Sequence, residues 1–128
     1  MELKFYKCIH CANILIPVVD SGMTPSCCGD TMELLKAGAI DAAIEKHVAV
    51  INRDDDGHHV TISVGAVPHP MADDHYIQAI VLLSGDRTFI FDLEPGDEPF
   101  AKCSIADNKV PLTAYAYCNL HGLWKADA

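Results

Sequence analysis

The chain is organised around the stretch from Tyr117 to Trp124, which reads Tyr-Cys-Asn-Leu-His-Gly-Leu-Trp. This stretch places a thiol and an imidazole three residues apart, in a short segment that Asn119 and Gly122 punctuate. Because these two residue types favour turns, both donor side chains can face one metal ion. By itself this pair of donors is a weak indication of a metal site.

Three histidines upstream give the stretch its weight. These upstream histidines are His47, His69 and His75. Together with Cys118 and His121 they make five metal donors from separate parts of the chain. Each donor lies at the end of an expected strand or in a loop, and a β-sandwich can bring its loops together at one rim. The five donors converge only if the chain between them folds back on itself.

The sequence after residue 46 alternates between short β-type runs and turns. Val60, Ile62 and Val64 alternate with polar neighbours, and the acidic turn before them ends in Asp56-Gly57, which is typical of a hairpin. Six or seven strands at this spacing, with no long helical pattern, predict an all-β fold, an antiparallel sandwich of immunoglobulin type. The expected strands cover residues 47–52, 58–67, 76–84, 88–93, 100–106 and 110–118.

The first 37 residues carry four cysteines, Cys8-x-x-Cys11 and the pair Cys27-Cys28. A segment this short cannot bury enough apolar surface to fold alone, so a metal or disulfides usually supply the missing stability. Four thiolates from two ends of a small β unit suit a tetrahedral iron or zinc site. We therefore expect a metal module at residues 1–37 and the sandwich at 38–128, joined by a connector at 36–46 that can hold one helical turn.

Composition limits the partners and the compartment. The 128 residues carry a formal net charge of -9, which disfavours nucleic acid and anionic membrane surfaces. No signal-peptide pattern and no apolar run of about 20 residues is present, so we expect a soluble cytoplasmic protein. In that compartment cysteines serve as metal ligands or buried thiols, and we expect Cys103 to be a buried thiol. Three disulfides in an exported protein are the alternative, which the adjacent Cys27 and Cys28 disfavour.

Four imidazoles and one thiolate exceed the four ligands of a structural zinc site. They favour a redox metal with one open position, where a thiolate opposite that position pushes electron density toward a bound ligand. We expect such a site to bind and reduce a small diatomic molecule. Just before His47, Lys46 can attract a small anion and Glu45 can occupy the open position after oxidation, although a solvated charge pair is an equal alternative.

These motifs resemble those of desulfoferrodoxin, the two-iron class of superoxide reductase, over nearly the whole chain. The four-cysteine segment is similar to that family's desulforedoxin module, which binds one iron. The family's catalytic motifs follow in order as Glu45-Lys46-His47, His69-Pro70-Met71, His75-Tyr76 and Cys118-Asn119-Leu120-His121-Gly122.

The resemblance implies a second iron with Cys118 as axial ligand and four equatorial histidines, His47, His69, His75 and His121. It implies that the enzyme reduces superoxide to hydrogen peroxide with one electron and two protons and releases no dioxygen. By the same analogy Lys46 attracts the anion and orders a proton-carrying water, and Glu45 ligates the oxidised iron after peroxide leaves. A rubredoxin-like protein would return the electron, and the chain would form homodimers.

Two positions depart from the family's pattern. Ala12 stands where the family commonly has Gly, and a left-handed conformation there would cost about 1 kcal/mol. Ala49 stands where the family commonly has Pro, which leaves the loop bearing Glu45 and Lys46 less rigid.

Two other functions stay open: an electron-transfer protein in which both metals only carry electrons, and a structural zinc protein whose histidines bind no metal.

Overall fold

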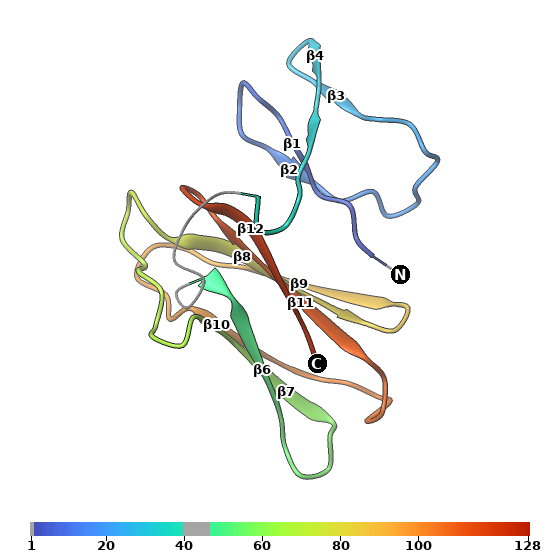
Figure 1. Cartoon of the computed structure of the whole chain (residues 1–128), viewed down its shortest axis with the longest axis vertical. Coiled ribbons are helices and arrows are strands. Elements are labelled where there is room, and N and C mark those ends of the chain that lie inside the picture. Colours follow the sequence, from blue (N-terminus) through green and yellow to red (C-terminus); the bar gives the residue numbers. More distant parts are fainter. Residues whose placement is uncertain (1, 40–46) are drawn as a thin grey trace. The chain divides into compact units, whose positions relative to one another are not determined.

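The computed structural model describes residues 2–39 and 47–128, so the expected helical turn falls largely on residues 40–46, outside the described part. The chain divides into two compact units, Met1–Lys36 and Ala37–Ala128 (Figure 1). All the named elements in the described residues are β-strands, which confirms the predicted all-β class. No helix in this part of the chain is long and apolar enough to cross a membrane.

The first unit is built from very short strands, as its turn-rich sequence predicts. One sheet has the strand order β2-β1-β5 and a separate hairpin joins β3 to β4. Its buried core is correspondingly small and consists of Tyr6, Cys8 and Met32. A core of this size supplies little hydrophobic stabilisation, so the unit depends on its cysteines. The strands are β1 (Tyr6–Lys7), β2 (Ile14–Leu15), β3 (Ser26–Cys27), β4 (Asp30–Thr31) and β5 (Glu33–Leu34).

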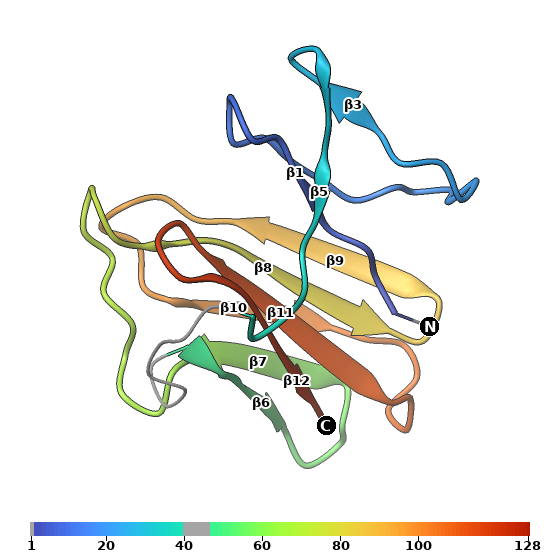
Figure 2. The ribbon, with the colours of Figure 1, turned by 45° about the horizontal axis from the view of Figure 1, so that its top comes forward.

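The second unit is a sandwich of two antiparallel sheets, with strand orders β10-β7-β6 and β12-β11-β8-β9 (Figure 2). The predicted strands are present, with shifted ends. The structure adds one strand that the sequence analysis missed, β12, which pairs with β11 after the turn at residues 119–121. The strands are β6 (Ala49–Arg53), β7 (His59–Val64), β8 (Ile77–Ser84), β9 (Arg87–Asp92), β10 (Phe100–Ser104), β11 (Leu112–Cys118) and β12 (Gly122–Asp127).

The core of the sandwich lies between the two sheets. Along β7 the alternating side chains are buried, as the pattern Val60, Ile62, Val64 predicts. They pack in one cluster with residues of β8 and β11, among them Ile80 and Ala116, which are both 0% exposed. This packing fixes the register of both sheets, because a slip of one residue would turn the apolar side chains toward water.

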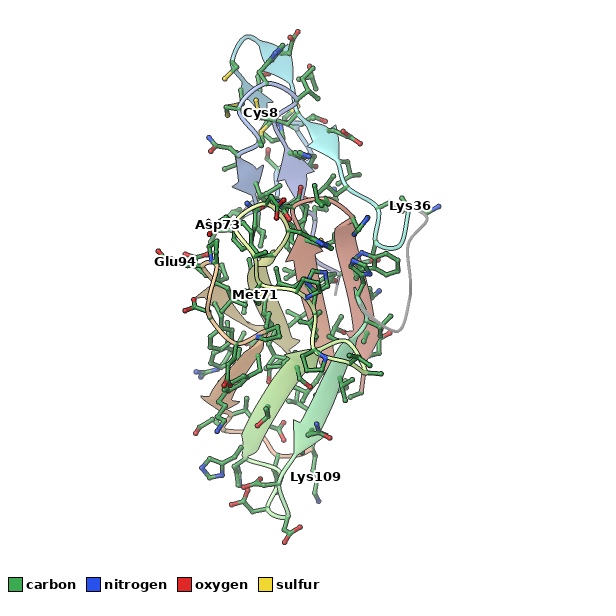
Figure 3. All side chains as sticks on the ribbon, turned by 90° about the vertical axis from the view of Figure 1, so that its left-hand side faces the viewer. Cys8, Lys36, Met71, Asp73, Glu94 and Lys109 are labelled. Carbon is green, nitrogen blue, oxygen red and sulfur yellow. The ribbon has the colours of Figure 1, made fainter. Side chains whose placement is uncertain are left out.

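The register brings several loops to one end of the sandwich. The first residue of β6, Ala49, pairs with the last residue of β7, Val64. In the other sheet the end of β11, Cys118, pairs with the start of β8, Ile77. The β7–β8 loop, which contains Met71 and Asp73, therefore lies at the same end as the β11–β12 turn, and the turn containing Lys109 lies at the opposite end (Figure 3).

Candidate metal centres

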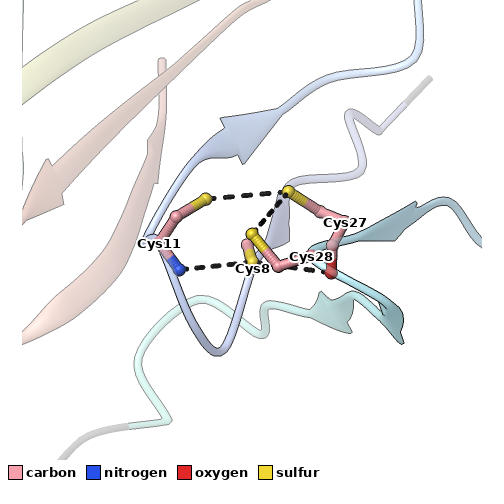
Figure 4. A group of neighbouring side chains, drawn as sticks. All are labelled: Cys8, Cys11, Cys27 and Cys28. Atoms are coloured by element: carbon pink, nitrogen blue, oxygen red, sulfur yellow. Dashed lines mark hydrogen bonds between the residues drawn. The ribbon is translucent and has the colours of Figure 1, made fainter.

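Four cysteines of the first unit form one compact group (Figure 4). Their sulfur atoms all lie within 4.8 Å of one another, and the Sγ atoms of Cys11 and Cys27 are 3.6 Å apart. All six cysteines of the chain are free thiols, so the disulfide alternative finds no support in the described residues. The group consists of Cys8, Cys11, Cys27 and Cys28.

The backbone of the loop after Cys8 prepares this group for a cation. The N–H groups of His10 and Cys11 both donate to Sγ of Cys8 at 3.4 Å. These bonds, that of Cys11 first, lower the pKa of Cys8 to about 6, so this residue is a thiolate at neutral pH. The hydrogen bond with that sulfur is the main reason that the pKa of Cys27 rises to about 12. The group can therefore carry four thiolates only around a bound cation, because a coordinating cation deprotonates thiols outright.

The turn that shapes this loop requires an unusual backbone. Ala12 donates its N–H to the carbonyl of Cys8 at 3.1 Å and has a φ of 63°. Cys28 also has a positive φ, 52°. Both conformations lie in the left-handed region that only glycine adopts without cost. The departure at Ala12 therefore falls on a position where the turn does need a positive φ.

Four histidine rings form a closed square in the second unit. Neighbouring ring centroids lie 4.8 Å apart between His47 and His69, His69 and His75, and His47 and His121, and 5.1 Å apart between His75 and His121. Each ring meets its neighbours edge-on, at interplanar angles from 72° to 86°. Such a square suits four imidazoles around one metal ion.

The thiol of Cys118 joins this square. Donor atoms of Cys118 and of three of the histidines, His47, His75 and His121, lie within 4.8 Å of one another. His69 is not in that group of donor atoms, but its ring contacts the rings of His47 and His75. The structure thus brings together all five donors that the sequence analysis singled out in this unit. Glu45 and Lys46 lie outside the described residues.

Each donor lies at the end of a strand, just before one, or in a loop that joins two strands. His47 comes two residues before β6, and His69 and His75 lie in the β7–β8 loop. Cys118 is the last residue of β11, and His121 directly precedes β12. The pairing of Cys118 with both Ile77 and Gly122 holds the thiol at the end of an interior strand of its sheet.

Comparison with known proteins matches this arrangement to a family. The family model Desulfoferrodoxin matches residues 39–127. The chain is 45% identical over 127 residues to desulfoferrodoxin from Nitratidesulfovibrio vulgaris, covering 99% of this chain and 98% of that protein. The chain belongs to the desulfoferrodoxin family. The full-length match shows that the relationship extends over the four-cysteine unit as well as the sandwich.

Solved structures of related proteins share the fold of this chain, one over nearly its whole length and one over about two thirds of it. The superoxide reductase from Treponema pallidum is 30% identical, with a TM-score of 0.80 and coverage of 98% of this chain and 99% of that chain. The one-iron superoxide reductase from Giardia intestinalis is 36% identical, with a TM-score of 0.58. The matched region covers 66% of this chain and 97% of the Giardia protein.

The residues of this chain fit a metal ion at the histidine square. Nδ1 of His69 donates to the carbonyl of Pro70 at 2.7 Å, which leaves Nε2 as the nitrogen with the lone pair. That Nε2 is buried and has no hydrogen-bond partner among the described residues. Burial lowers the pKa of His69 to about 4, so the imidazole is neutral at pH 7. A bound metal would satisfy a buried nitrogen that otherwise costs about 1–3 kcal/mol.

Cys118 also fits a cation. Its side chain is fully buried, and this burial raises the pKa of the thiol. Hydrogen bonds from the backbone N–H groups of His121 and Leu120 act in the opposite direction. These two bonds are already in place to stabilise a thiolate once a metal ion displaces the proton. Four imidazoles and this thiolate suit iron, and with the four-cysteine group the chain holds two iron centres.

Trp124 is a functional neighbour to which the sequence analysis gave no role. Its ring stacks on His47 with centroids 5.0 Å apart and an interplanar angle of 25°. Its Nε1 donates to the carbonyl of His121 at 3.0 Å. One buried side chain thus supports two of the four histidines. The position of Trp124 within the organising stretch was the available signal, but its contact with His47 depends on the fold.

Three other residues with potential donor atoms belong to neither of these two ligand groups. Cys103, expected to be a buried thiol, is half-buried in β10 and packs against the core. The side chain of His10 is exposed and pairs with Asp30, with Nε2 and Oδ2 2.5 Å apart. His59 is exposed and pairs with Asp54.

Proposed function

We propose that this chain is a superoxide reductase that converts superoxide to hydrogen peroxide, using one electron and two protons and releasing no dioxygen. The observation that carries this proposal is the square of four histidine rings beside the buried thiol of Cys118. Five donors leave one position of a six-coordinate metal available to a small ligand. A protein that only carries electrons needs no such position, so the electron-transfer alternative is not favoured.

We assign two sets of ligands. The first iron is bound by Cys8, Cys11, Cys27 and Cys28, and the second by His47, His69, His75, Cys118 and His121. When bound, the second iron supplies the electron that reduces superoxide. The chain's own residues prepare the site: Pro70 fixes the tautomer of His69, and the N–H groups of Leu120 and His121 stabilise the thiolate.

Two further residues act on the substrate. Lys46 directly precedes the proposed ligand His47 in the chain. On a protein of net charge -9 it provides the local attraction that a small anion needs, and it orders a water that carries protons. Glu45 would supply a carboxylate ligand to the iron in its oxidised state. Both roles rest on the resemblance and on the order of the residues.

The remaining assignments concern the organisation of the protein. We assign residues 1–37 to the desulforedoxin-like iron module and residues 38–128 to the catalytic sandwich. The division into compact units after Lys36 supports this boundary. The electron donor is a small rubredoxin-like protein, the chain forms a homodimer, and the protein acts in the cytoplasm. Its acidic charge makes nucleic acid and anionic membranes unfavourable partners.

The decisive experiment measures the products of superoxide consumption in the reduced protein. A reductase forms one hydrogen peroxide per superoxide and no dioxygen, whereas a dismutase forms half as much peroxide together with dioxygen. Cys118→Ser should abolish the fast reaction, because it removes the thiolate ligand. The matched control is Cys103→Ser, which changes a half-buried thiol outside both cysteine-containing centres. Reversible oxidation of both irons without a fast step would instead establish an electron-transfer protein.

A further inference from the structure

Asn119, which lies between Cys118 and His121, makes three hydrogen bonds to the segment that carries His75. Its backbone N–H donates to the carbonyl of Tyr76 at 3.2 Å. Its side-chain Oδ1 accepts from the N–H of Tyr76 at 2.9 Å, and its Nδ2 donates to the carbonyl of Asp74 at 3.1 Å. The side chain thus holds the residues on both sides of His75.

These bonds replace the end of a strand ladder. The pairing of β11 with β8 shifts register between Tyr117 and Cys118 and ends with Cys118 opposite Ile77. At the next position Asn119 continues the ladder with its N–H, but the partner's N–H is bonded to the side-chain oxygen rather than to a backbone carbonyl. The backbone after Asn119 can therefore turn toward His121 while the strand end stays paired.

The chemistry of the side chain suits this position. An amide offers an acceptor and a donor from one planar group, so it can bond an N–H and a carbonyl of the same segment. A carboxylate of the same shape would keep the acceptor but turn a second acceptor toward the carbonyl of Asp74. Asn119 is only partly buried, so the bonds rather than apolar packing explain its contribution.

We propose that Asn119 is a positioning residue, which fixes His75 relative to Cys118 and His121 and so sets the geometry between imidazole and thiolate. The ring of His75 contacts the rings of His69 and His121, so movement of its backbone would distort the square. This inference rests on the proposed function, because it concerns the same iron centre. Residues that orient ligands without touching the metal typically change metal affinity by about 10–100-fold.

The test compares Asn119→Asp and Asn119→Ala with a matched control. The control is Asn108→Asp, because Nδ2 of Asn108 likewise donates to a backbone carbonyl, that of Asp56 at 2.9 Å, in an exposed turn outside the metal centres. Three quantities are measured: iron affinity in chelator competition, the energy of the thiolate-to-iron absorption band of the oxidised histidine centre, and hydrogen exchange of the Tyr76 amide in metal-free protein. The four-cysteine centre serves as an internal reference.

Both Asn119 variants should bind iron about 10-fold more weakly at the histidine centre and should shift its absorption band. Exchange at Tyr76 should be faster in Asn119→Ala, which loses the acceptor, and unchanged in Asn119→Asp, which keeps it. Asn108→Asp and the four-cysteine centre should be unaffected. Exchange of the Tyr76 amide reports on its hydrogen bond to Asn119 even where a variant binds no iron.

Several outcomes overturn the assignment. Unchanged affinity and an unshifted band in both Asn119 variants would do so, as would equal changes in Asn108→Asp. If the unsubstituted protein reacts rapidly with superoxide while these results hold, only the role of Asn119 fails. If instead the Asn119 variants shift the band but no form of the protein reacts with superoxide, the positioning role stands and the proposed function fails.

Discussion

Nε2 of His47 lies 3.0 Å from Nδ1 of His121, although 74 positions separate the two residues in the chain. A metal bound by imidazole nitrogens at about 2.1 Å holds neighbouring nitrogens at a right angle about 3.0 Å apart. The two atoms therefore already have the spacing of adjacent ligands. His47 presents its Nε2 to the centre, and His121 presents its Nδ1.

Replacing His121 with Ala should lower the iron content of the histidine centre and weaken its affinity at least 10-fold, because a ligand is lost and the buried nitrogen of His47 loses its neighbour. Metal analysis before and after dialysis against a chelator measures this. His58→Ala is the control, since Nδ1 of His58 donates to the carbonyl of Ile105, outside the metal centres. Equal iron loss in the two variants would contradict the ligand role of His121.

Ala12→Gly should stabilise the four-cysteine unit by about 1 kcal/mol, because glycine adopts the φ of 63° without the steric cost that a Cβ imposes. Metal release from this unit in increasing denaturant measures the effect. Ala106→Gly provides the comparison, since Ala106 is exposed and does not have a positive φ. That substitution should be neutral or slightly destabilising. A loss of stability in Ala12→Gly would refute the explanation.

Lys46→Ala should slow the reaction with superoxide about tenfold at low salt and weaken its dependence on ionic strength, because the local attraction for the anion is lost. Both irons should stay bound. Lys109→Ala removes the same charge from a turn at the end of the sandwich away from Met71 and Asp73 (Figure 3). Rapid mixing or pulse radiolysis at several salt concentrations gives the rates. Identical rates in the two variants would remove Lys46 from the mechanism.

Glu45→Ala should change the absorption spectrum of the oxidised protein while leaving the first encounter with superoxide nearly as fast. The reason is that Glu45 is proposed to ligate the iron only after peroxide leaves. Spectra of the oxidised variant and rates of the reduced variant test the two halves separately. A large loss of encounter rate would show that this carboxylate acts earlier.

The imidazole of His59 should titrate above its ordinary pKa of about 6.5. Its Nδ1 lies 2.8 Å from Oδ2 of Asp54, and the hydrogen bond to this carboxylate raises the pKa of His59. The pair therefore contributes stability below pH 6.5, and this contribution disappears as the pH rises through the pKa of the folded protein. NMR titration of Asp54→Asn should show the pKa of His59 falling. An unchanged titration would assign the shift to another group.

Local patterns in the sequence were sufficient for several features. The alternation of Val60, Ile62 and Val64 predicted a strand with one buried face, because the period of a strand is two residues. The spacing of the cysteines predicted a four-thiol group, and the structure gathers those sulfurs. Strand β12 was missed, since Lys125 and Asp127 interrupt a short apolar run, and its pairing with β11 depends on the turn before it.

The sequence by itself determined which donors are present and that the chain forms β-strands, because composition, spacing and period are local properties. Only the tertiary structure decided how His47 meets His121, why Asn119 bonds to both neighbours of His75, and that Trp124 stacks on His47. It also decided that Ala12 adopts a positive φ. These relationships depend on sheet register and on turns closed by distant partners, which no short pattern encodes.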